Sequence, residues 1–388
     1  MDDRNYGLGF SVFPGIGPQT FQKLLSEFGS AKSAWESKRP RLAEIIGEKT
    51  LARFEDFRNT FSLEDYAKKL LRKEVSFLLL TDKEYPKLLK EIKNPPIVLY
   101  VKGNMEVLSR HSGEELKRRL QNPDSGRAPL ARMTEEPIIA IVGTRKITEY
   151  GKEVTKLLTT DLVSAGFTIV SGLAIGVDSV AHQTTIDQHG KTIAVLGCGV
   201  DCCSPTTNQH IYNSILANGG CIVSEFPLGQ PPTQGSFPSR NRIIAGLSLG
   251  VLVTEGAEDS GALITADYAF QNQRKVFAVP GPITSSLSKG PYKLLEKGAK
   301  LVTSAQDILD EFKMQKSKGK ITNQNSKVRG GTEEEREILE ILENESLHFD
   351  EIVRRLGLTS AKTGSTLSLM EVKGLIKSSD GGIFSIAS

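Results

Sequence analysis

The stretch FPSRNRIIAGLSLGVLVTEG, residues 237–256, contains the pattern that decides the fold. It begins with a phenylalanine, a proline and two nearby arginines, Arg240 and Arg242, and becomes apolar almost at once. Its second half, GVLVTEG, is a short and nearly continuous apolar run, which is typical of a strand buried on both faces of a parallel sheet. We therefore predict a helix that packs on a sheet and is followed directly by one of the core strands.

Further runs of this kind lie between residues 138 and 304, and helix-length stretches separate them. Two more strands, joined by a loop, are predicted within residues 75–103. Strands and helices that alternate in this way predict an α/β fold, here a doubly wound, mainly parallel, extended Rossmann-like sheet. The predicted parallel strands are 138–143, 167–172, 191–197, 221–226, 250–256, 275–281 and 300–304.

The chain divides into several predicted parts. Residues 1–80 show helical spacing of apolar residues and predict a SAM-like or helix-hairpin-helix-like domain, whose GIGP turn either binds phosphate or only closes a small helical bundle. We place the extended Rossmann-like domain at 81–310, with a polar insertion at 109–136, and a lysine-rich linker at 311–331. Residues 332–388 combine a helix–turn–helix period with a hairpin and predict a winged helix.

Composition limits the location and partners of the chain. The 388 residues carry a net charge of +3, which is too small to indicate nucleic-acid binding unless the charge is placed locally. The first residues do not resemble an export signal, we expect the four cysteines to be reduced, and we predict a cytoplasmic protein. No apolar run approaches the roughly 18 residues that span a bilayer, so no membrane association is expected.

The predicted carboxyl ends of the strands carry mainly glycine, serine and threonine. Ligands of a doubly wound sheet bind outside these ends, where glycines permit close approach and helix N-termini favour anions. The cations predicted within reach are Arg145, Arg240, Arg242 and Lys289. We call the crevice outside these strand ends the mouth of the sheet. We expect the Pro-Ser pair at 238–239 to break the chain ahead of the helix, so that its two arginines face this mouth instead of the core and meet a phosphate-like anion.

Signatures of catalysis, cofactors and metals are weak. The first parallel strand is followed by GTRKITEYG instead of G-x-G-x-x-G, so a nicotinamide cofactor is not expected. The cysteines lack paired C-x2-C spacing, which predicts buried apolar packing and no metal site. Asp178 and His182 stand one helical turn apart, either as a catalytic pair or with the carboxylate bonded to its own helix start. We predict no catalytic residue and no cofactor.

Seven motifs between residues 138 and 309 resemble, in their order, the bacterial DNA-processing protein A family (DprA, also called Smf). The most specific of them is FPSRNRIIAGLS. The motifs are IVGTRKITEYG, IVSGLAIGVDSVAH, VLGCGVD, SEFPLGQPPTQGSFPSRNRIIAGLS, EGAEDSGALITADYA, RKVFAVPG and GAKLVTSAQDIL.

The resemblance implies a recombination mediator and not an enzyme. Such a protein is a homodimer that binds and protects single-stranded DNA and loads the RecA recombinase on DNA taken up during natural transformation. In this chain the arginines of the matching motifs would hold phosphate, while Phe237 either stacks on a base or faces the core. The predicted DNA-binding residues are Arg145, Ser171, Gly172, Phe237, Arg240, Asn241, Arg242, Ser260, Gly261 and Lys289.

The chain departs from the family pattern at three places. Within GLAxGID the family commonly has a cation where this chain has Ile175. The Tyr-Pro-Arg or Tyr-Pro-Lys that often follows GCGxD is replaced by Ser-Pro-Thr, which ends at Thr206. The third departure is the insertion 109–136. The two lost cations should weaken phosphate binding or move it elsewhere, for instance to the basic triplet 117–119 of the insertion.

Two other functions stay open. A nucleotide-binding hydrolase of the phosphoribohydrolase type shares glycine-rich strand ends, although its PGGxGTxxE stretch is absent and Glu255-Gly256 is followed here by Ala-Glu-Asp. The second open function is that of a winged-helix transcription regulator with a ligand-sensing core. Residues 332–388 hold 11 acidic and 6 basic residues, a net charge of −5, which favours a protein contact or regulatory role over the reading of duplex DNA.

Overall fold

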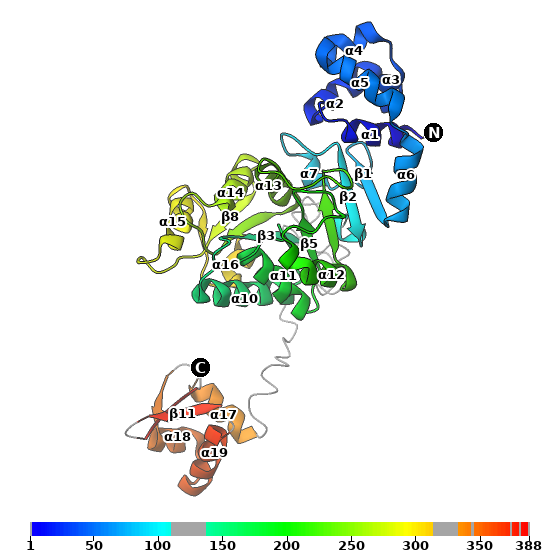
Figure 1. Cartoon of the computed structure of the whole chain (residues 1–388). Helices are drawn as coiled ribbons and strands as arrows, with labels where there is room; N and C mark the ends of the chain where they lie inside the picture. The colour runs from blue at the N-terminus through cyan, green and yellow to red at the C-terminus, as the bar shows by residue number, and fades with distance from the viewer. Residues whose placement is uncertain are drawn as a thin grey trace, which may run out of the picture. The chain divides into compact units, whose positions relative to one another are not determined.

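A computed structural model of the chain describes residues 2–109, 137–312, 333–342, 345–372, 375–379 and 382–386 (Figure 1). The chain forms two compact units, Met1–Lys316 and Ser317–Ser388. Most of the predicted insertion and linker, residues 110–136 and 313–331, lies outside the described residues.

The first unit is built on a nine-stranded sheet with the order β1-β2-β6-β5-β4-β3-β7-β8-β9. The strands from β3 to β9 pair in parallel, whereas β2 pairs antiparallel with both β1 and β6. The predicted doubly wound, mainly parallel sheet is therefore confirmed. The strands are β1 Val75–Leu79, β2 Val98–Gly103, β3 Ile138–Val142, β4 Thr168–Ser171, β5 Thr192–Val195, β6 Cys221–Ser224, β7 Gly250–Val253, β8 Lys275–Ala278 and β9 Lys300–Leu301.

The order of the strands creates a switch point beside β3. From β3 the chain proceeds outward through β4, β5 and β6, and then returns to the other side of β3 to add β7, β8 and β9. The connections on the two sides of β3 leave in opposite directions, which opens a crevice at the carboxyl ends of the strands. The loops after β3, β4 and β7 therefore form the position at which a ligand is expected.

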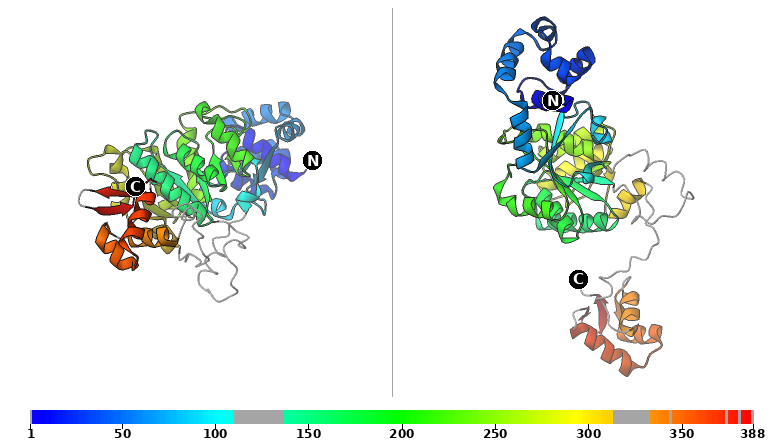
Figure 2. Two further views of the ribbon diagram at one scale, coloured as in Figure 1. Left: turned by 90° about the horizontal axis from the view of Figure 1, so that it is seen from below. Right: turned by 90° about the vertical axis from the view of Figure 1, so that its right-hand side faces the viewer.

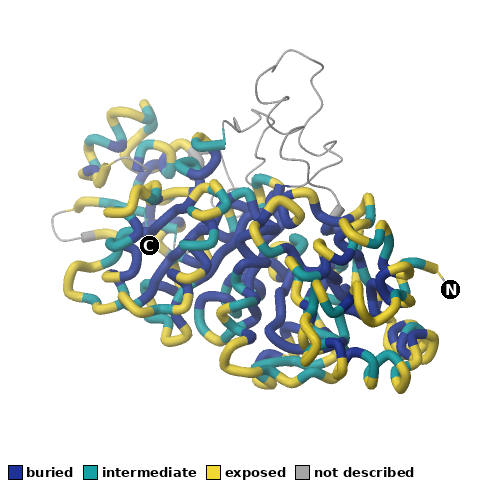
Figure 3. Tube along the Cα trace, turned by 90° about the horizontal axis from the view of Figure 1, so that it is seen from above, coloured by how far each residue is buried: buried dark blue, intermediate teal, exposed yellow. Residues whose placement is uncertain are grey.

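Helices cover both faces of this sheet (Figures 1 and 2). On one face, Ile243 and Leu263 from two helices pack against strand side chains such as Val251. On the other, Leu158 packs against Ile141, and the tube of Figure 3 shows a buried centre with exposed segments around it. The first face carries α7 Lys87–Lys90, α13 Ser236–Leu247 and α14 Gly261–Gln271, and the second α10 Glu149–Ser164, α11 Val177–Asp187 and α16 Ala305–Glu311. The remaining helices of this part are α8 Glu106–Ser109, α12 Gln209–Ala217 and α15 Lys289–Glu296.

The N-terminal helices enclose an aromatic core. Phe10 stacks on Phe54 with ring centroids 5.3 Å apart, and Trp35 meets both rings edge-on. This core continues onto the sheet, where the Tyr66 hydroxyl accepts a hydrogen bond from the Leu228 backbone N–H at 3.0 Å. The sheet begins at Val75, ahead of the boundary predicted at residue 80. The helices are α1 Asp3–Val12, α2 Pro18–Phe28, α3 Ala31–Glu36, α4 Arg39–Ile46, α5 Glu48–Thr60 and α6 Leu63–Arg72.

The second unit is a winged helix, as predicted. In its described residues, three helices and a three-stranded sheet of order β10-β12-β11 surround a small core that includes Ile338, Ile352 and Met370. Gly382, with φ of 73°, lies in the turn of the wing hairpin, a conformation that favours glycine. The elements are α17 Glu333–Leu342, β10 Leu347–His348, α18 Phe349–Leu356, α19 Ser360–Val372, β11 Ile376–Ser379 and β12 Ile383–Ile386.

Candidate nucleic-acid interface

The loop between β3 and α10 brings the first cations to the mouth of the sheet. Arg145 and Lys146 are both exposed there. The Arg145 guanidinium lies over the Phe237 ring, 5.4 Å from its centroid. Gly197 makes room for this ring, because a Cβ at that position would approach it to 3.3 Å. An exposed cation and an aromatic face, contributed by two distant segments, thus meet at one point of the mouth.

A buried carboxylate closes the N-terminus of α10. Glu255 follows β7, and its two oxygens accept from the Thr148 hydroxyl at 2.7 Å and from the Thr148 backbone N–H at 3.0 Å. A Cβ on Gly151 would come within 2.0 Å of the carboxylate, so this glycine is required for the approach. In dinucleotide-binding folds the first helix N-terminus of this kind holds pyrophosphate. Here a negative side chain occupies that position and would repel a nucleotide phosphate.

Sequence reasoning placed Glu255 only at a strand end and missed this role. The sequence did contain an indication of it, because an acidic residue directly after a core strand needs hydrogen-bond donors if it is buried. Which helix would supply those donors depends on β3 and β7 being neighbours, and that follows only from the strand order.

The position of Arg240 corrects the sequence prediction. Helix α13 begins at Ser236, so Pro238 lies in its first turn, where a missing N–H costs little, and both arginines lie within the helix. The prediction that they stand outside the core was wrong, because Arg240 is only 4% exposed. Its Nη1 donates to the Val195 carbonyl at 2.7 Å, and a Cβ on Gly172 would come within 1.8 Å of the same atom.

Asp178 balances the buried charge of Arg240. Burial lowers the pKa of the Arg240 guanidinium, and the negative charge of Asp178 opposes that shift. Burial also raises the pKa of the Asp178 carboxyl, which accepts from the backbone N–H groups of Gly172 at 3.0 Å and Ala174 at 3.4 Å. Arg240 therefore positions the loop after β4 from below the mouth.

His182 is not part of a catalytic pair with Asp178. Its Nδ1 lies 2.7 Å from the Thr192 hydroxyl, which itself donates to the Ile169 carbonyl, so Nδ1 must donate. The side chain is fully buried, and burial lowers the pKa of His182 to about 3. Of the two interpretations, the carboxylate of Asp178 bonded to the local backbone is the one present.

Arg242 is also buried, contrary to the prediction, and it is fully engaged. It is 9% exposed, and its Nη1 and Nη2 donate to the two oxygens of Glu225 at 2.5 and 2.6 Å. Its Nε donates to the Asn94 carbonyl at 2.9 Å. This bidentate ion pair joins α13 to the loop after β6 and to the segment before β2, and it leaves the guanidinium committed to the protein interior.

The other predicted DNA-binding residues range from buried to exposed. Ser171 is buried and donates to the Ile141 carbonyl at 2.6 Å. Asn241 is half-buried and donates to the Gly261 carbonyl at 3.2 Å. Ser260 accepts from the Ala262 backbone N–H at 3.3 Å as the N-cap of α14, which the exposed Gly261 begins. These contacts shape the mouth, and they engage the Ser171 hydroxyl as a donor and the Ser260 hydroxyl as an acceptor.

Lys289 is exposed at the start of α15, as a cation near the mouth should be. The next residue, Gly290, donates to the Gly256 carbonyl at 2.9 Å, which ties this helix start to the loop after β7. That loop also carries the exposed Glu258 and Asp259 directly before Ser260. The mouth is therefore basic beside β3 and of mixed charge beside β7.

The prediction of buried packing holds for two of the four cysteines, whereas Cys202 and Cys203 are half-buried. Cys198 and Cys221 are buried, and burial raises the pKa of each. Within the described ranges, no three His, Cys, Asp or Glu side chains gather as metal ligands.

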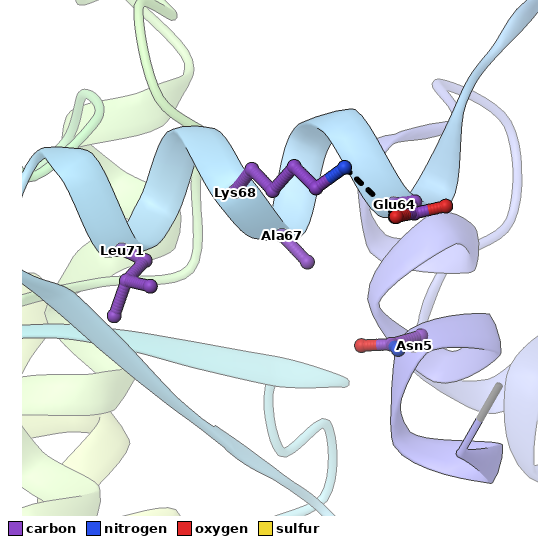
Figure 4. A pocket seen from close by; sticks show the side chains of 5 residues that line it. All are labelled: Asn5, Glu64, Ala67, Lys68 and Leu71. Atoms are coloured by element: carbon purple, nitrogen blue, oxygen red, sulfur yellow. Dashed lines mark ion pairs between the residues drawn. The ribbon is translucent and has the colours of Figure 1, made fainter.

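A separate hollow of about 560 Å³ lies between α1 and α6, away from the mouth (Figure 4). Lys68 and Glu64 on its wall form an ion pair at 2.8 Å, and Leu71 beside them is 79% exposed. Asn5 and Ala67 complete the lining. This set offers neither a nucleophile nor a cluster of cations, so the mouth of the sheet remains the candidate site.

The fold and site together define a class of protein. It is a doubly wound α/β protein whose sheet mouth presents exposed cations and an aromatic ring, and which carries a winged helix. The family model of DNA recombination-mediator protein A matches residues 76–113 and 128–313, and that of the DprA winged helix domain matches residues 324–382. The chain belongs to the DNA recombination-mediator protein A family.

Known relatives agree with this assignment. Protein Smf of Synechocystis sp. is 37% identical over 309 residues, which cover 79% of this chain and 72% of the relative. DNA processing protein DprA of Streptococcus pneumoniae is 38% identical over 276 residues, or 70% of this chain and 86% of the relative. The X-ray structure of DNA processing protein A from Streptococcus pneumoniae matches with a TM-score of 0.64 and 33% identity, over 79% of this chain and 98% of that one.

Among the described residues, no helix combines the length and apolar character needed to cross a membrane.

Proposed function

We propose that the chain binds single-stranded DNA across the mouth of its sheet and acts there as a recombination mediator without chemistry of its own. The exposed Arg145 guanidinium over the Phe237 ring supports this most directly. A cation beside an aromatic face can hold a phosphate and stack on a base of the same strand. Duplex DNA hides its base faces, so this pair favours a single strand.

The distribution of charge suggests where the strand runs. Lys146 adds a second exposed cation beside Arg145, whereas Glu258 and Asp259 follow β7. A phosphate backbone is attracted to the first pair, whereas beside β7 Lys293 neutralises Glu258 in an ion pair at 3.4 Å and Asp259 adds a negative charge. The proposed path therefore crosses the loops after β3, β4 and β5. In this proposal Ser171, Gly172 and Arg240 shape the floor of the path from below.

The absence of chemistry is part of the proposal. Glu255 fills the helix N-terminus that a nucleotide would need, and His182 is buried without surface access. Both observations speak against the alternative, a hydrolase of the phosphoribohydrolase type. Release of a free base from a nucleoside monophosphate would support that alternative instead.

The partners that the family suggests are part of the same proposal. They are the RecA recombinase and a second copy of the chain, in the cytoplasm. For a homodimer, β9 is the last strand of the described sheet, and its Leu301 is 47% exposed. An edge strand with an exposed apolar side chain suits pairing with another copy. The molecular mass of the full chain in solution tests this point.

The experiment that tests the site is a salt titration of oligo(dT) binding by fluorescence anisotropy, with Arg145→Ala and, as the matched control, Arg72→Ala. Arg72 is an exposed arginine at the end of α6. We expect Arg145→Ala to weaken binding about tenfold and to reduce the slope of log K against log salt by about 0.7, since one phosphate contact is lost. Arg72→Ala should leave both values unchanged. Equal behaviour of the two variants would rule out this site.

A further inference from the structure

Ile175 is an apolar residue whose side chain is exposed to solvent beside the proposed DNA path. It is 46% exposed, in the loop between β4 and α11. Exposed isoleucines cost hydration free energy, and a single one on a protein surface is ordinary. What distinguishes Ile175 is its rigid support and its neighbour.

The loop that presents Ile175 is fixed from three sides. The Leu173 carbonyl accepts from the Asn208 side chain at 2.9 Å, and Asp178 accepts from Ala174 N–H at 3.4 Å. The Val177 N–H donates to the Thr144 carbonyl at 3.2 Å. An apolar side chain on such a loop cannot turn inward without breaking these bonds, so its exposure is built into the fold.

The residue that follows Ile175, Gly176, lies against the backbone of Arg145. Gly176, with φ of 85°, lies so close that a Cβ there would meet the Thr144 carbonyl at 2.2 Å and the Arg145 backbone at 2.9 Å. The chain can make this approach only with glycine. Ile175 therefore stands next to the residue whose guanidinium covers the Phe237 ring.

We propose that Ile175 is a base-contacting residue, which packs on a nucleobase of the strand that Arg145 holds by its phosphate. The inference rests on the proposed single-strand site and adds a contact that is apolar and indifferent to base identity. Apolar contact with a base releases no counterions. It follows that Ile175 strengthens binding without adding to its salt dependence.

The test compares two strands of equal length and charge, oligo(dT) and an oligomer of abasic sites, with the full chain. We expect Ile175→Ala to weaken oligo(dT) binding about fivefold, from the loss of buried apolar area, and to leave abasic binding and both salt slopes unchanged. Ile175→Leu should bind like the wild type. Ile175→Lys should steepen the slope on both strands by about 0.7, because it adds a phosphate contact. Leu157→Ala, on a residue of α10 that is 58% exposed, is the matched control.

The outcomes separate the two levels of the proposal. Suppose that Arg145→Ala weakens binding. If Ile175→Ala then has no effect, or weakens binding of oligo(dT) and of the abasic oligomer equally, the base contact is wrong and the site stands. If neither variant changes oligo(dT) binding, the site itself is wrong and the base contact with it. Thermal unfolding of each variant confirms that the exposed substitutions leave the fold intact.

Discussion

Two segments of the mouth carry arginines, and the fold uses them in opposite ways. In the loop after β3, Arg145 is exposed and its guanidinium lies over the Phe237 ring. In α13, Arg240 and Arg242 are buried and bonded to protein oxygens. Guanidiniums in the most family-specific motif therefore hold the site together, whereas the loop arginine is the one that contacts DNA in the proposed function. Substitutions in the two segments should separate stability from binding.

The largest expected effect is on folding, at Arg242. Arg242→Ala leaves Glu225 as an uncompensated carboxylate at a half-buried position and should lower the free energy of unfolding by about 3–5 kcal/mol. Urea denaturation followed by circular dichroism measures the loss. The double variant Arg242→Met with Glu225→Leu removes both charges and should recover much of it. A stable single variant with weakened DNA binding would show that Arg242 belongs to the binding surface after all.

The next effect is smaller, at Arg240. Arg240→Met keeps the volume but removes the charge opposite Asp178, and should lower the free energy of unfolding by about 2–3 kcal/mol. Asp178→Asn in the same chain should restore part of that stability. We expect the salt slope of oligo(dT) binding to change by much less than the shift of about 0.7 expected for Arg145→Ala. An equal change of slope would mean that the buried guanidinium reaches phosphate directly.

His182 predicts a pH effect on the same buried layer. The folded-state pKa of about 3 lies below the ordinary value of 6.5, so protonation favours the unfolded chain. Its contribution to stability is complete above about pH 6.5 and falls by about 1.4 kcal/mol for each pH unit below, or about 2 kcal/mol by pH 5. The difference in unfolding free energy between the wild type and His182→Gln, measured from pH 7 to pH 5, should show that slope. A difference independent of pH would contradict the buried neutral imidazole.

The smallest effect concerns the winged helix. Residues 332–388 have a net charge of −5, so their removal should not weaken single-strand binding at the sheet mouth. We expect a protein truncated at residue 316, the end of the first compact unit, to bind oligo(dT) with an affinity within about threefold of that of the full chain. Any change should be an increase, because negative charge is removed. A large loss of affinity would instead assign part of the DNA site to this module.

Much of this organisation follows from the sequence by itself. The apolar runs predict every strand of the parallel sheet. From β3 to β7 the reason is that residues buried on both faces leave a continuous pattern that depends only on neighbours along the chain, whereas β9 is an exposed edge strand. The winged helix is predicted for the same reason, from local periodicity and a glycine hairpin. The motifs also place Arg145 and Phe237 in one candidate site before the structure brings them together.

Only the tertiary structure decided how the charges are used. Whether Arg240 and Arg242 lie inside or outside the core depends on the carbonyl of Val195, on Glu225 and on Asn94, which come from separate parts of the chain. The capping role of Glu255 likewise depends on β3 and β7 being adjacent in the sheet. A charged side chain is stable in the interior only when its partners surround it, and partners distant in sequence leave no local pattern.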